Sequence, residues 1–317
     1  MKHISIVVPV YNERENIHSL ITEVQKVFEE LPYTYSFIIV DDGSIDGTLD
    51  VLRMASAADT RIRYISLSKN FGHQNALKAG LDHARGDCVI TMDGDLQHPP
   101  ALIPHLVTYW EQGYDVVYTL RQDDETNTGY AKRKTSRLFY KLMNRMADLD
   151  IEEGSADFRL LSKKVLYTLQ GIDEHEIFFR GLVKWVGFRQ IGVPYKAAPR
   201  TKGQSKYSFK KMMRFAVQGI TSFSTKPLYI AAYLGLVFSF LALLYIPYAL
   251  VSYLSGHVVN GWASIIVTIA FFGGLQLSIL GIIGLYIGKI FMQVKKRPHY
   301  IIKELKHVQE AISSTQF

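Results

Sequence analysis

The sequence predicts an α/β protein with a mixed, mostly parallel sheet, followed by interfacial amphipathic helices and a hairpin of two transmembrane helices. Three observations lead to this fold class. The first 120 residues alternate short apolar runs with amphipathic segments, as parallel sheets covered by helices do. Residues 227–288 contain no Asp, Glu, Lys or Arg, and this stretch is far longer than one membrane-spanning helix needs. Lysine and arginine residues gather on both sides of it.

The strands and helices of the α/β part follow one another in order. Apolar runs predict strands at residues 4–10, 37–40, 62–67, 88–92 and 115–119. Apolar residues at helical spacing predict helices at residues 15–30, 46–57, 74–84 and 104–112. Ligands of such sheets bind beyond the carboxyl ends of the strands, so we expect the polar residues that follow each strand to form a site there.

Two later segments, residues 134–146 and 207–223, combine basic and apolar residues at helical spacing. Such helices can lie in a membrane interface. Packing on the protein's own core is an equally good interpretation of the first segment. The second runs straight into the apolar stretch, which favours the interface.

The apolar stretch divides into two expected spans, at about residues 227–253 and 263–288. Each exceeds the roughly 20 residues that cross a bilayer, and the alternative is a buried hairpin in a soluble core. Glycines in the second span allow close helix contacts and a homo-oligomer. Residues 177–303 contain sixteen Lys or Arg and no acid, and the loop between the spans has no basic residue. The positive-inside rule therefore predicts that both termini are cytoplasmic.

The sharpest chemical feature is the pair Asp93 and Asp95, which follows a buried apolar strand. Hard carboxylate oxygens at this spacing can hold Mg²⁺ or Mn²⁺ against a diphosphate, with Gln97 as a further ligand. A solvated turn is the alternative, and we expect Gly94 to permit a tight turn. The adjacent Asp41 and Asp42 also follow a strand, where they can bind a nucleotide, cap the next helix, or do both.

Several segments together resemble a known family. The sequence reads VVPVYNE at residues 7–13, VDDGS at 40–44 and DGDLQHPP at 93–100. These motifs are similar to glycosyltransferase family 2 with the Rossmann-like GT-A fold. SADFR at residues 155–159 and GQSKYS at 203–208, followed by two spans, resemble its polyprenyl-phosphate glycosyltransferase branch, and within it the bactoprenol glucosyltransferases.

The resemblance implies roles for individual residues. Donor-nucleotide contacts are expected at Pro9, Tyr11, Glu13, Asp41, Asp42 and Asp93, and metal ligands at Asp93, Asp95 and Gln97. Catalytic residues are expected at Asp157, Asp95 and Arg200. Contacts to the lipid phosphate or the diphosphate are expected at Arg121, Arg133, Ser136, Arg200, Ser205 and Lys206. Two histidines near the expected site, His73 and His98, are more often structural than metal-binding in such positions.

The implied reaction is inverting transfer of a hexose, glucose in the closest branch, from a UDP-sugar to undecaprenyl phosphate. It takes place at the cytoplasmic face of the plasma membrane, with a divalent metal as cofactor. The alternatives are another donor, GDP-mannose or a UDP-aminosugar, and a non-catalytic nucleotide-binding scaffold. The expected partners are the nucleotide-sugar, polyprenyl phosphate, the bilayer, a second copy of the chain and a flippase that takes the product. Nucleic acid is not expected, because the membrane already accounts for the basic flanks.

The expected domains are a cytoplasmic GT-A catalytic domain at residues 1–205, an interfacial helix at 206–225, two transmembrane helices at 226–289 and a cytoplasmic tail at 290–317. The strand–helix alternation looks complete without the spans. We therefore expect a chain truncated after Phe223 to remain a soluble domain that binds UDP. An acceptor phosphate monoester is mostly dianionic at pH 7, so Asp157 need not act as a base. It can instead orient the acceptor, pair with a cation such as Arg200 or Lys206, or bind the sugar.

Overall fold

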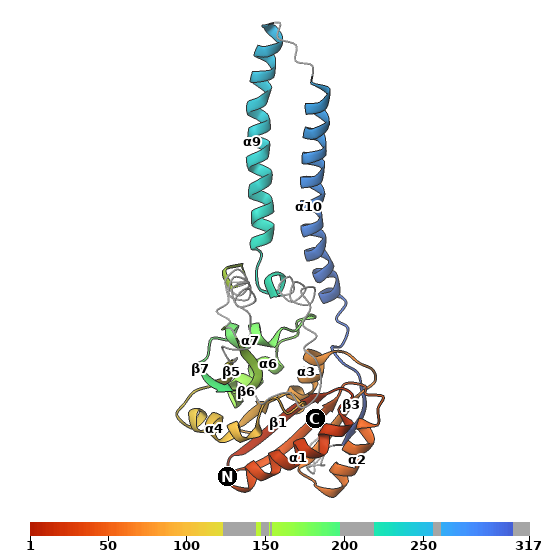
Figure 1. Cartoon of the computed structure of the whole chain (residues 1–317), viewed down its shortest axis with the longest axis vertical. Coiled ribbons are helices and arrows are strands. Elements are labelled where there is room, and N and C mark those ends of the chain that lie inside the picture. Colours follow the sequence, from red (N-terminus) through yellow and green to blue (C-terminus); the bar gives the residue numbers. More distant parts are fainter. Residues whose placement is uncertain (123–143, 147–151, 153, 197–218, 256–260, 307–317) are drawn as a thin grey trace, which may run out of the picture. The chain divides into compact units, whose positions relative to one another are not determined.

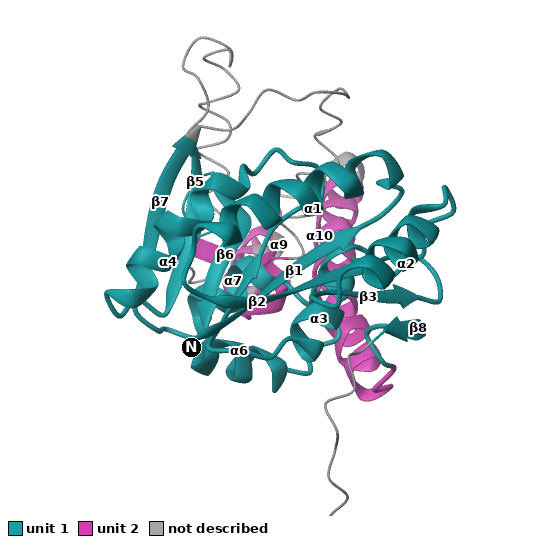
Figure 2. Ribbon diagram, turned by 90° about the horizontal axis from the view of Figure 1, so that it is seen from below, with its two compact units in different colours: residues 1–144, 149–209, 298–317 teal, residues 145–148, 210–297 magenta. Residues whose placement is uncertain are grey.

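The structure is a computed structural model that describes residues 1–122, 144–146, 152, 154–196, 219–255 and 261–306. The chain divides into two compact units (Figure 2). Unit 1 comprises residues 1–144, 149–209 and 298–317, and unit 2 comprises residues 145–148 and 210–297. Both expected amphipathic segments, 134–146 and 207–223, lie mostly outside the described residues.

In its described residues, unit 1 is built on one sheet of eight strands in the order β7-β5-β6-β4-β1-β2-β3-β8. The strands are β1 (His3–Val10), β2 (Thr34–Asp41), β3 (Ile62–Leu67), β4 (Cys88–Thr91), β5 (Val116–Gln122), β6 (Ser155–Ser162), β7 (Gln190–Lys196) and β8 (Ile302–Lys306). Strands β4, β1, β2 and β3 are mutually parallel, as β5 and β7 are. Strand β6 runs antiparallel between β4 and β5, and β8 runs antiparallel to β3. This confirms the mixed, mostly parallel sheet.

Helices cover both faces of the sheet (Figures 1 and 2). The helices of unit 1 are α1 (Arg14–Glu29), α2 (Thr48–Ala58), α3 (His73–His83), α4 (Ile103–Glu111), α6 (Lys163–Gln170) and α7 (Phe179–Trp185), with the 3₁₀ turn η1 (Pro100–Leu102) before α4. Alternate residues of β1 point to opposite faces. Ile4, Ile6 and Val8 belong to a fully buried cluster with residues of α1, α2 and α4. On the other face, α3 approaches β1 so closely that a Cβ on Gly80 would lie 2.2 Å from Val7 Cγ1.

Two differences from the expected elements have clear causes. Helix α2 begins at Thr48 rather than at residue 46, because Asp46 Oδ1 accepts hydrogen bonds from the Thr48 N–H and hydroxyl and so forms the preceding turn. Strands β6 and β7 were not predicted. Strand β6 contains the buried charged residues Asp157 and Arg159, which hide its apolar pattern.

The expectation that the sheet is complete without the C-terminal tail is wrong. Strand β8 follows both long helices along the chain and forms the edge of the sheet beside β3. The Arg53 guanidinium donates two hydrogen bonds to the Glu304 carboxylate, and the Tyr64 hydroxyl donates another. Lys306 Nζ donates to the Ser56 carbonyl at 3.0 Å. Truncation after Phe223 would therefore remove part of the sheet.

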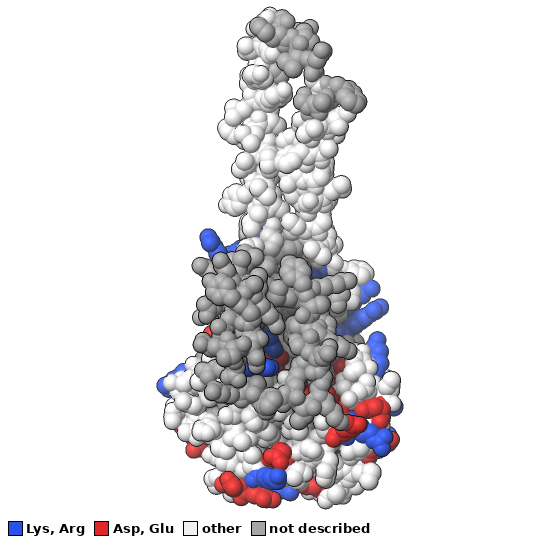
Figure 3. All heavy atoms as spheres, viewed as in Figure 1, with Lys and Arg blue, Asp and Glu red and all other residues white. Residues whose placement is uncertain are grey.

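Unit 2 contains two long apolar helices, α9 (Lys226–Leu254) and α10 (Trp262–Val294). Both are long and apolar enough to cross a membrane. Phe238 of α9 packs edge-on against Phe271 and Phe272 of α10, with ring centroids 5.7 Å apart in both pairs. Between residues 227 and 288, the outward side chains that the structure describes are uncharged and mostly apolar (Figure 3). A soluble core would bury such side chains, so their exposure counts against the buried-hairpin alternative.

Candidate active site

The loop after β4 carries the acid pair at the edge of the sheet. The Asp95 carboxylate accepts hydrogen bonds from the Gln97 backbone N–H, at 3.1 Å, and from the Gln97 side-chain amide. Leu96 between them has a φ of 56°, a left-handed conformation that is uncommon for a residue with a Cβ. The loop is therefore folded so that Gln97 fixes Asp95, and the expected contact of Gln97 with a metal stays a prediction.

Gly94 has a different role from the expected one. Its backbone is not in the left-handed region, and Leu96 makes the turn instead. A Cβ at residue 94 would lie 2.7 Å from Val10 Cγ1, which is too close for any side chain. Glycine is required here because the acid loop packs directly against the end of β1.

Asp157 lies near the start of β6, and the antiparallel direction of β6 brings it to the edge where β4 ends. Arg180 of α7 donates to both of its oxygens, with Nε at 3.1 Å from Oδ1 and Nη2 at 3.0 Å from Oδ2. Arg159 Nη2 lies 3.2 Å from Oδ1. Asp157 is thus a buried carboxylate paired with two guanidinium groups.

These pairings control the protonation of the cluster. Burial alone would raise the pKa of Asp157, but the charges of Arg180 and Arg159 outweigh it and hold the pKa well below its usual range. Burial lowers the pKa of Arg159 to about 10, even though the Asp157 charge acts in the opposite direction. Both groups are charged at neutral pH, so Asp157 is a poor proton acceptor.

Two histidines stand next to Asp93. His73, the first residue of α3, has Nε2 at 3.5 Å from Asp93 Oδ1 and at 3.9 Å from Asp157 Oδ2. His98 Nε2 lies 3.1 Å from the other carboxylate oxygen, Asp93 Oδ2. The His73 side chain is 42% exposed and that of His98 only 9%. His73 therefore connects the acid loop with Asp157 on the open side of the site, and His98 supports Asp93 from within.

Asp41 and Asp42 are buried at the end of β2, and both have structural contacts. Asp41 accepts hydrogen bonds from the Ser44 N–H and the Ser66 hydroxyl, both at 3.0 Å. Asp42 accepts from the N–H groups of Phe71 and Gly72, at 2.7 and 2.9 Å. Burial raises the pKa of Asp42, and the two N–H donors partly counteract that rise. Asp42 holds the loop that places His73; its expected contact with the nucleotide stays a prediction.

The other expected nucleotide residues follow β1. Pro9 is buried within β1, Tyr11 is exposed, and Glu13 is half-buried at the start of α1. Burial raises the pKa of Glu13, the hydrogen bond from Asn16 lowers it, and the charge of Asp95 adds a smaller rise. That electrostatic interaction places Glu13 in the same charged neighbourhood as the acid loop. Asn12 joins this loop to the next one, since its side-chain oxygen accepts from the Ile45 N–H at 3.0 Å.

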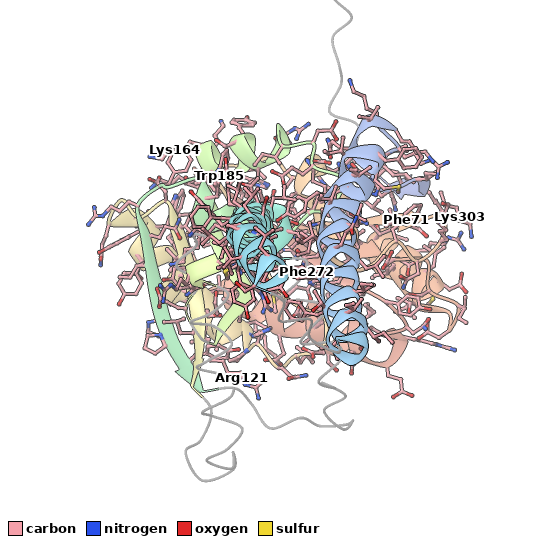
Figure 4. The ribbon with its side chains drawn as sticks, turned by 90° about the horizontal axis from the view of Figure 1, so that it is seen from above. Phe71, Arg121, Lys164, Trp185, Phe272 and Lys303 are labelled. Carbon is pink, nitrogen blue, oxygen red and sulfur yellow. The ribbon has the colours of Figure 1, made fainter. Side chains whose placement is uncertain are left out.

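Arg121 lies within β5, not after it, and is exposed at the rim of the sheet (Figure 4). It is in register with Tyr195 of β7. The other five residues expected to meet phosphates lie outside the described residues; they are Arg133, Ser136, Arg200, Ser205 and Lys206. Their roles stay predictions.

Sequence reasoning missed Arg159, Arg180 and Tyr195. The first was detectable, because residues 157 and 159 are two apart and so share one face of any strand. Arg180 and Tyr195 have no comparable signal, because their partners are 23 and 97 residues away.

The donor set of the acid loop fits a divalent cation that is only partly enclosed by protein. Asp93 and Asp95 supply the hard oxygen atoms that Mg²⁺ and Mn²⁺ prefer. Among the described residues, no group of three or more His, Cys, Asp or Glu side chains could hold a metal ion. Such an ion would therefore need further oxygen ligands from water or from a substrate diphosphate, as is usual for Mg²⁺ sites.

Comparison with known proteins gives the family. Residues 5–169 match the family described as Glycosyl transferase family 2. The chain belongs to glycosyltransferase family 2. This confirms both the expected family and the expectation of a glycosyltransferase enzyme with a GT-A fold.

Similarity to curated relatives extends over nearly the whole chain. The chain is 41% identical to the uncharacterized glycosyltransferase YkcC of Bacillus subtilis, covering 95% of this chain and 93% of that protein. It is 42% identical to the SfII prophage-derived bactoprenol glucosyl transferase of Shigella flexneri, covering 95% and 97%. A glucosyl-3-phosphoglycerate synthase from Mycobacterium tuberculosis, solved with Mn²⁺, UDP and phosphoglyceric acid, is 18% identical, with a TM-score of 0.49 and coverage of 69% and 76%.

Proposed function

We propose that this glycosyltransferase transfers a hexose, glucose, from a UDP-sugar to undecaprenyl phosphate at the cytoplasmic face of the membrane, with inversion at the sugar carbon. The proposal rests on the observation that two clusters of charged side chains lie close together at one edge of the sheet. These groups are the acid pair Asp93 and Asp95 and the arginine-paired Asp157, with His73 between Asp93 and Asp157. The name of the Shigella flexneri relative, a bactoprenol glucosyl transferase, supports a lipid carrier and glucose.

Asp93 and Asp95 are the residues that would hold a divalent cation, with Gln97 as a further ligand. A bound Mg²⁺ or Mn²⁺ would neutralise the charge of a leaving diphosphate. Gln97 keeps Asp95 oriented through its two hydrogen bonds. The neighbouring loops carry Tyr11, Glu13 and Asp42. Contacts to the nucleotide are proposed for these three residues and also for Pro9 and Asp41.

Asp157 is proposed to act by position and not as a base. Its two guanidinium partners keep it ionised, and a phosphate monoester with a second pKa of about 6 is already an adequate nucleophile at neutral pH. What the reaction requires is that two anions approach each other, so cationic groups near the acceptor stabilise the encounter. Arg180 is half-buried beside Asp157, and Asp157 fixes its guanidinium group. Arg121, Arg133, Ser136, Arg200, Ser205 and Lys206 are the further proposed phosphate contacts.

The proposed topology rests on unit 2 and on the basic residues around it. The exposed apolar surfaces of α9 and α10 suit a bilayer, and Lys226, Lys289 and Lys295 lie at the end of the hairpin away from its loop. The positive-inside rule puts that end, and both termini, in the cytoplasm. We propose residues 1–205 as the catalytic domain, with residues 298–306 added because they contain strand β8. The interfacial helix at 206–225, the spans at 226–289, self-association and a product-consuming flippase stay proposals.

The test is a transfer assay with the full-length protein in membranes. Labelled UDP-glucose, UDP-aminosugars and GDP-mannose are each incubated with undecaprenyl phosphate, with Mg²⁺, with Mn²⁺ or with EDTA. The expected result is a labelled lipid from UDP-glucose that requires the lipid phosphate and a divalent ion. If only GDP-mannose or only a UDP-aminosugar labels the lipid, the proposed donor, UDP-glucose, is wrong. If the transfer rate is unchanged in EDTA, the proposed metal site is wrong.

A further inference from the structure

His98 makes two hydrogen bonds that join distant parts of the sheet. Its Nε2 atom lies 3.1 Å from Asp93 Oδ2, and its Nδ1 atom lies 2.7 Å from the Tyr195 hydroxyl. The imidazole ring also packs near the rings of Phe158 and Tyr195, each with a centroid 5.7 Å away. His98 and Tyr195 are both buried. Through His98, the loop that follows β4 and holds the acid pair is thus connected to β7, which lies three strands from β4 in the sheet.

The chemistry of these groups fixes the direction of both hydrogen bonds. An ionised carboxylate can only accept, so the proton on the imidazole must be on Nε2, facing Asp93. In the neutral ring Nδ1 is then an acceptor, and it receives the Tyr195 O–H. The tyrosine hydroxyl therefore selects the one neutral tautomer that can donate to Asp93. Without that hydroxyl, a proton on Nδ1 would leave the Nε2 lone pair facing a carboxylate.

We propose that Tyr195 and His98 are positioning residues for the metal and diphosphate site, and that they act by fixing the Asp93 carboxylate through its Oδ2 atom. This inference rests on the proposed function, since Asp93 is there a ligand of the divalent ion. It accounts for the unequal surroundings of the two Asp93 oxygens. Oδ2 is held from the interior by His98, and Oδ1 lies on the side of the more exposed His73. Partners of this kind orient metal-binding carboxylates, and their loss typically weakens metal binding by about 10- to 100-fold.

The simplest test is Tyr195→Phe, which removes the hydroxyl and keeps the packed ring. Mn²⁺ binding to the purified full-length protein is measured by electron paramagnetic resonance in the presence of UDP. The Kd for Mn²⁺ is expected to rise about 10-fold or more. In the transfer assay, the Mn²⁺ concentration at half-maximal rate should rise similarly, while the rate at saturating Mn²⁺ recovers to within about threefold. A structural defect would lower the maximal rate and would not be overcome by added Mn²⁺.

A matched control is Tyr35→Phe. Tyr35 is likewise a buried tyrosine of this sheet, and its hydroxyl has no hydrogen-bond partner among the described residues. Its Mn²⁺ affinity should equal that of the unmodified protein. A second pair of variants guards against misfolding. His98→Gln places an amide donor near the position of Nε2 and should bind Mn²⁺ more tightly than His98→Leu, which cannot donate.

The outcomes separate the two proposals. An unchanged Mn²⁺ affinity in Tyr195→Phe, or equal affinities in His98→Gln and His98→Leu, would overturn the positioning role while leaving the proposed function intact. Absence of Mn²⁺ binding in the unmodified protein with UDP would overturn the metal site, and the positioning proposal with it.

Discussion

The two units of the chain treat charge and apolar surface in opposite ways. Unit 1 buries Asp157 and Arg159 and keeps them charged by pairing them with each other and with Arg180. Unit 2 has no charged side chain from residue 227 to residue 288 and exposes its leucines, isoleucines and phenylalanines. The difference shows that burial alone does not tell whether a side chain is polar or apolar. In unit 1, ion pairing allows charged side chains to be buried at the candidate site. In unit 2, the exposed apolar side chains suit an apolar medium such as a bilayer.

The largest expected effect tests the charged part of this comparison. Asp95→Asn removes one proposed charge at the metal and diphosphate site and should lower the transfer rate by about 10²–10³-fold, the usual cost of losing one preorganised electrostatic contact. The rate is measured with labelled UDP-glucose. Asp50→Asn is the control, since Asp50 is an acid on the surface of α2 whose side chain is 73% exposed. A rate that falls equally in both variants would contradict a specific role for Asp95.

The next effect tests the apolar part. Leu277 in α10 and Met54 in α2 are exposed to almost the same extent, 72% and 73%. Leu277→Lys should impair membrane insertion, because a lysine at the centre of a spanning helix costs about 2.5–3.5 kcal/mol. Met54→Lys should have no such effect, because we expect the exposed side of α2 to face water, where a lysine side chain stays hydrated. Insertion is measured by carbonate extraction of membranes, and equal extraction of both variants would remove the distinction between the units.

A smaller effect concerns the edge of the sheet in unit 1. A chain ending at Arg297 lacks β8 and should lose about 2 kcal/mol or more of stability, since each main-chain hydrogen bond lost contributes about 1 kcal/mol. Thermal unfolding in detergent measures the change. A chain ending at Lys306 retains β8 and is the control. Equal unfolding temperatures for the two truncated chains would show that β8 contributes nothing.

The smallest expected effect concerns the pH dependence of the transfer rate, which should stay the same when Asp157 is replaced by glutamate. The pKa of Asp157 is held below its usual range, so the charge that it contributes is present above pH 4 and is lost only as the pH falls below that value. The transfer rate should instead fall below about pH 6, as the acceptor phosphate gains its second proton. Asp157→Glu should leave this midpoint in place even if it lowers the rate. A shifted midpoint in the pH–rate profile would indicate that residue 157 exchanges the proton.

The sequence predicted those parts of the fold whose signal is local. Strands β1 to β4 are apolar runs followed by polar residues, and the hairpin is a long apolar stretch without charges, so both were predictable from hydrophobic pattern alone. Strand β8 was not, because its sequence IKELK is that of a charged edge strand and only pairing with β3 makes it part of the sheet.

The candidate site shows the same limit. Asp93, Asp95 and Asp157 were predicted from motifs, and the structure brings Asp93 and Asp157 to the same imidazole, that of His73. The partners that set their chemistry were not predicted. Arg180 and Tyr195 reach the site only because α7 and β7 pack beside β6 and β5, and no spacing in the sequence reports that. His98 was noted near the site, but its role depends on Tyr195 and could not be inferred from the motif.

The position of β8 along the chain has a consequence for biosynthesis. Its five residues are translated after both apolar helices, yet they pair with β3, which is translated some 240 residues earlier. While the ribosome is still making α9 and α10, the edge of β3 is without its final neighbour. The nascent enzyme therefore cannot finish its sheet before its hairpin has been synthesised, which links the completion of the folded enzyme to the delivery of its apolar helices.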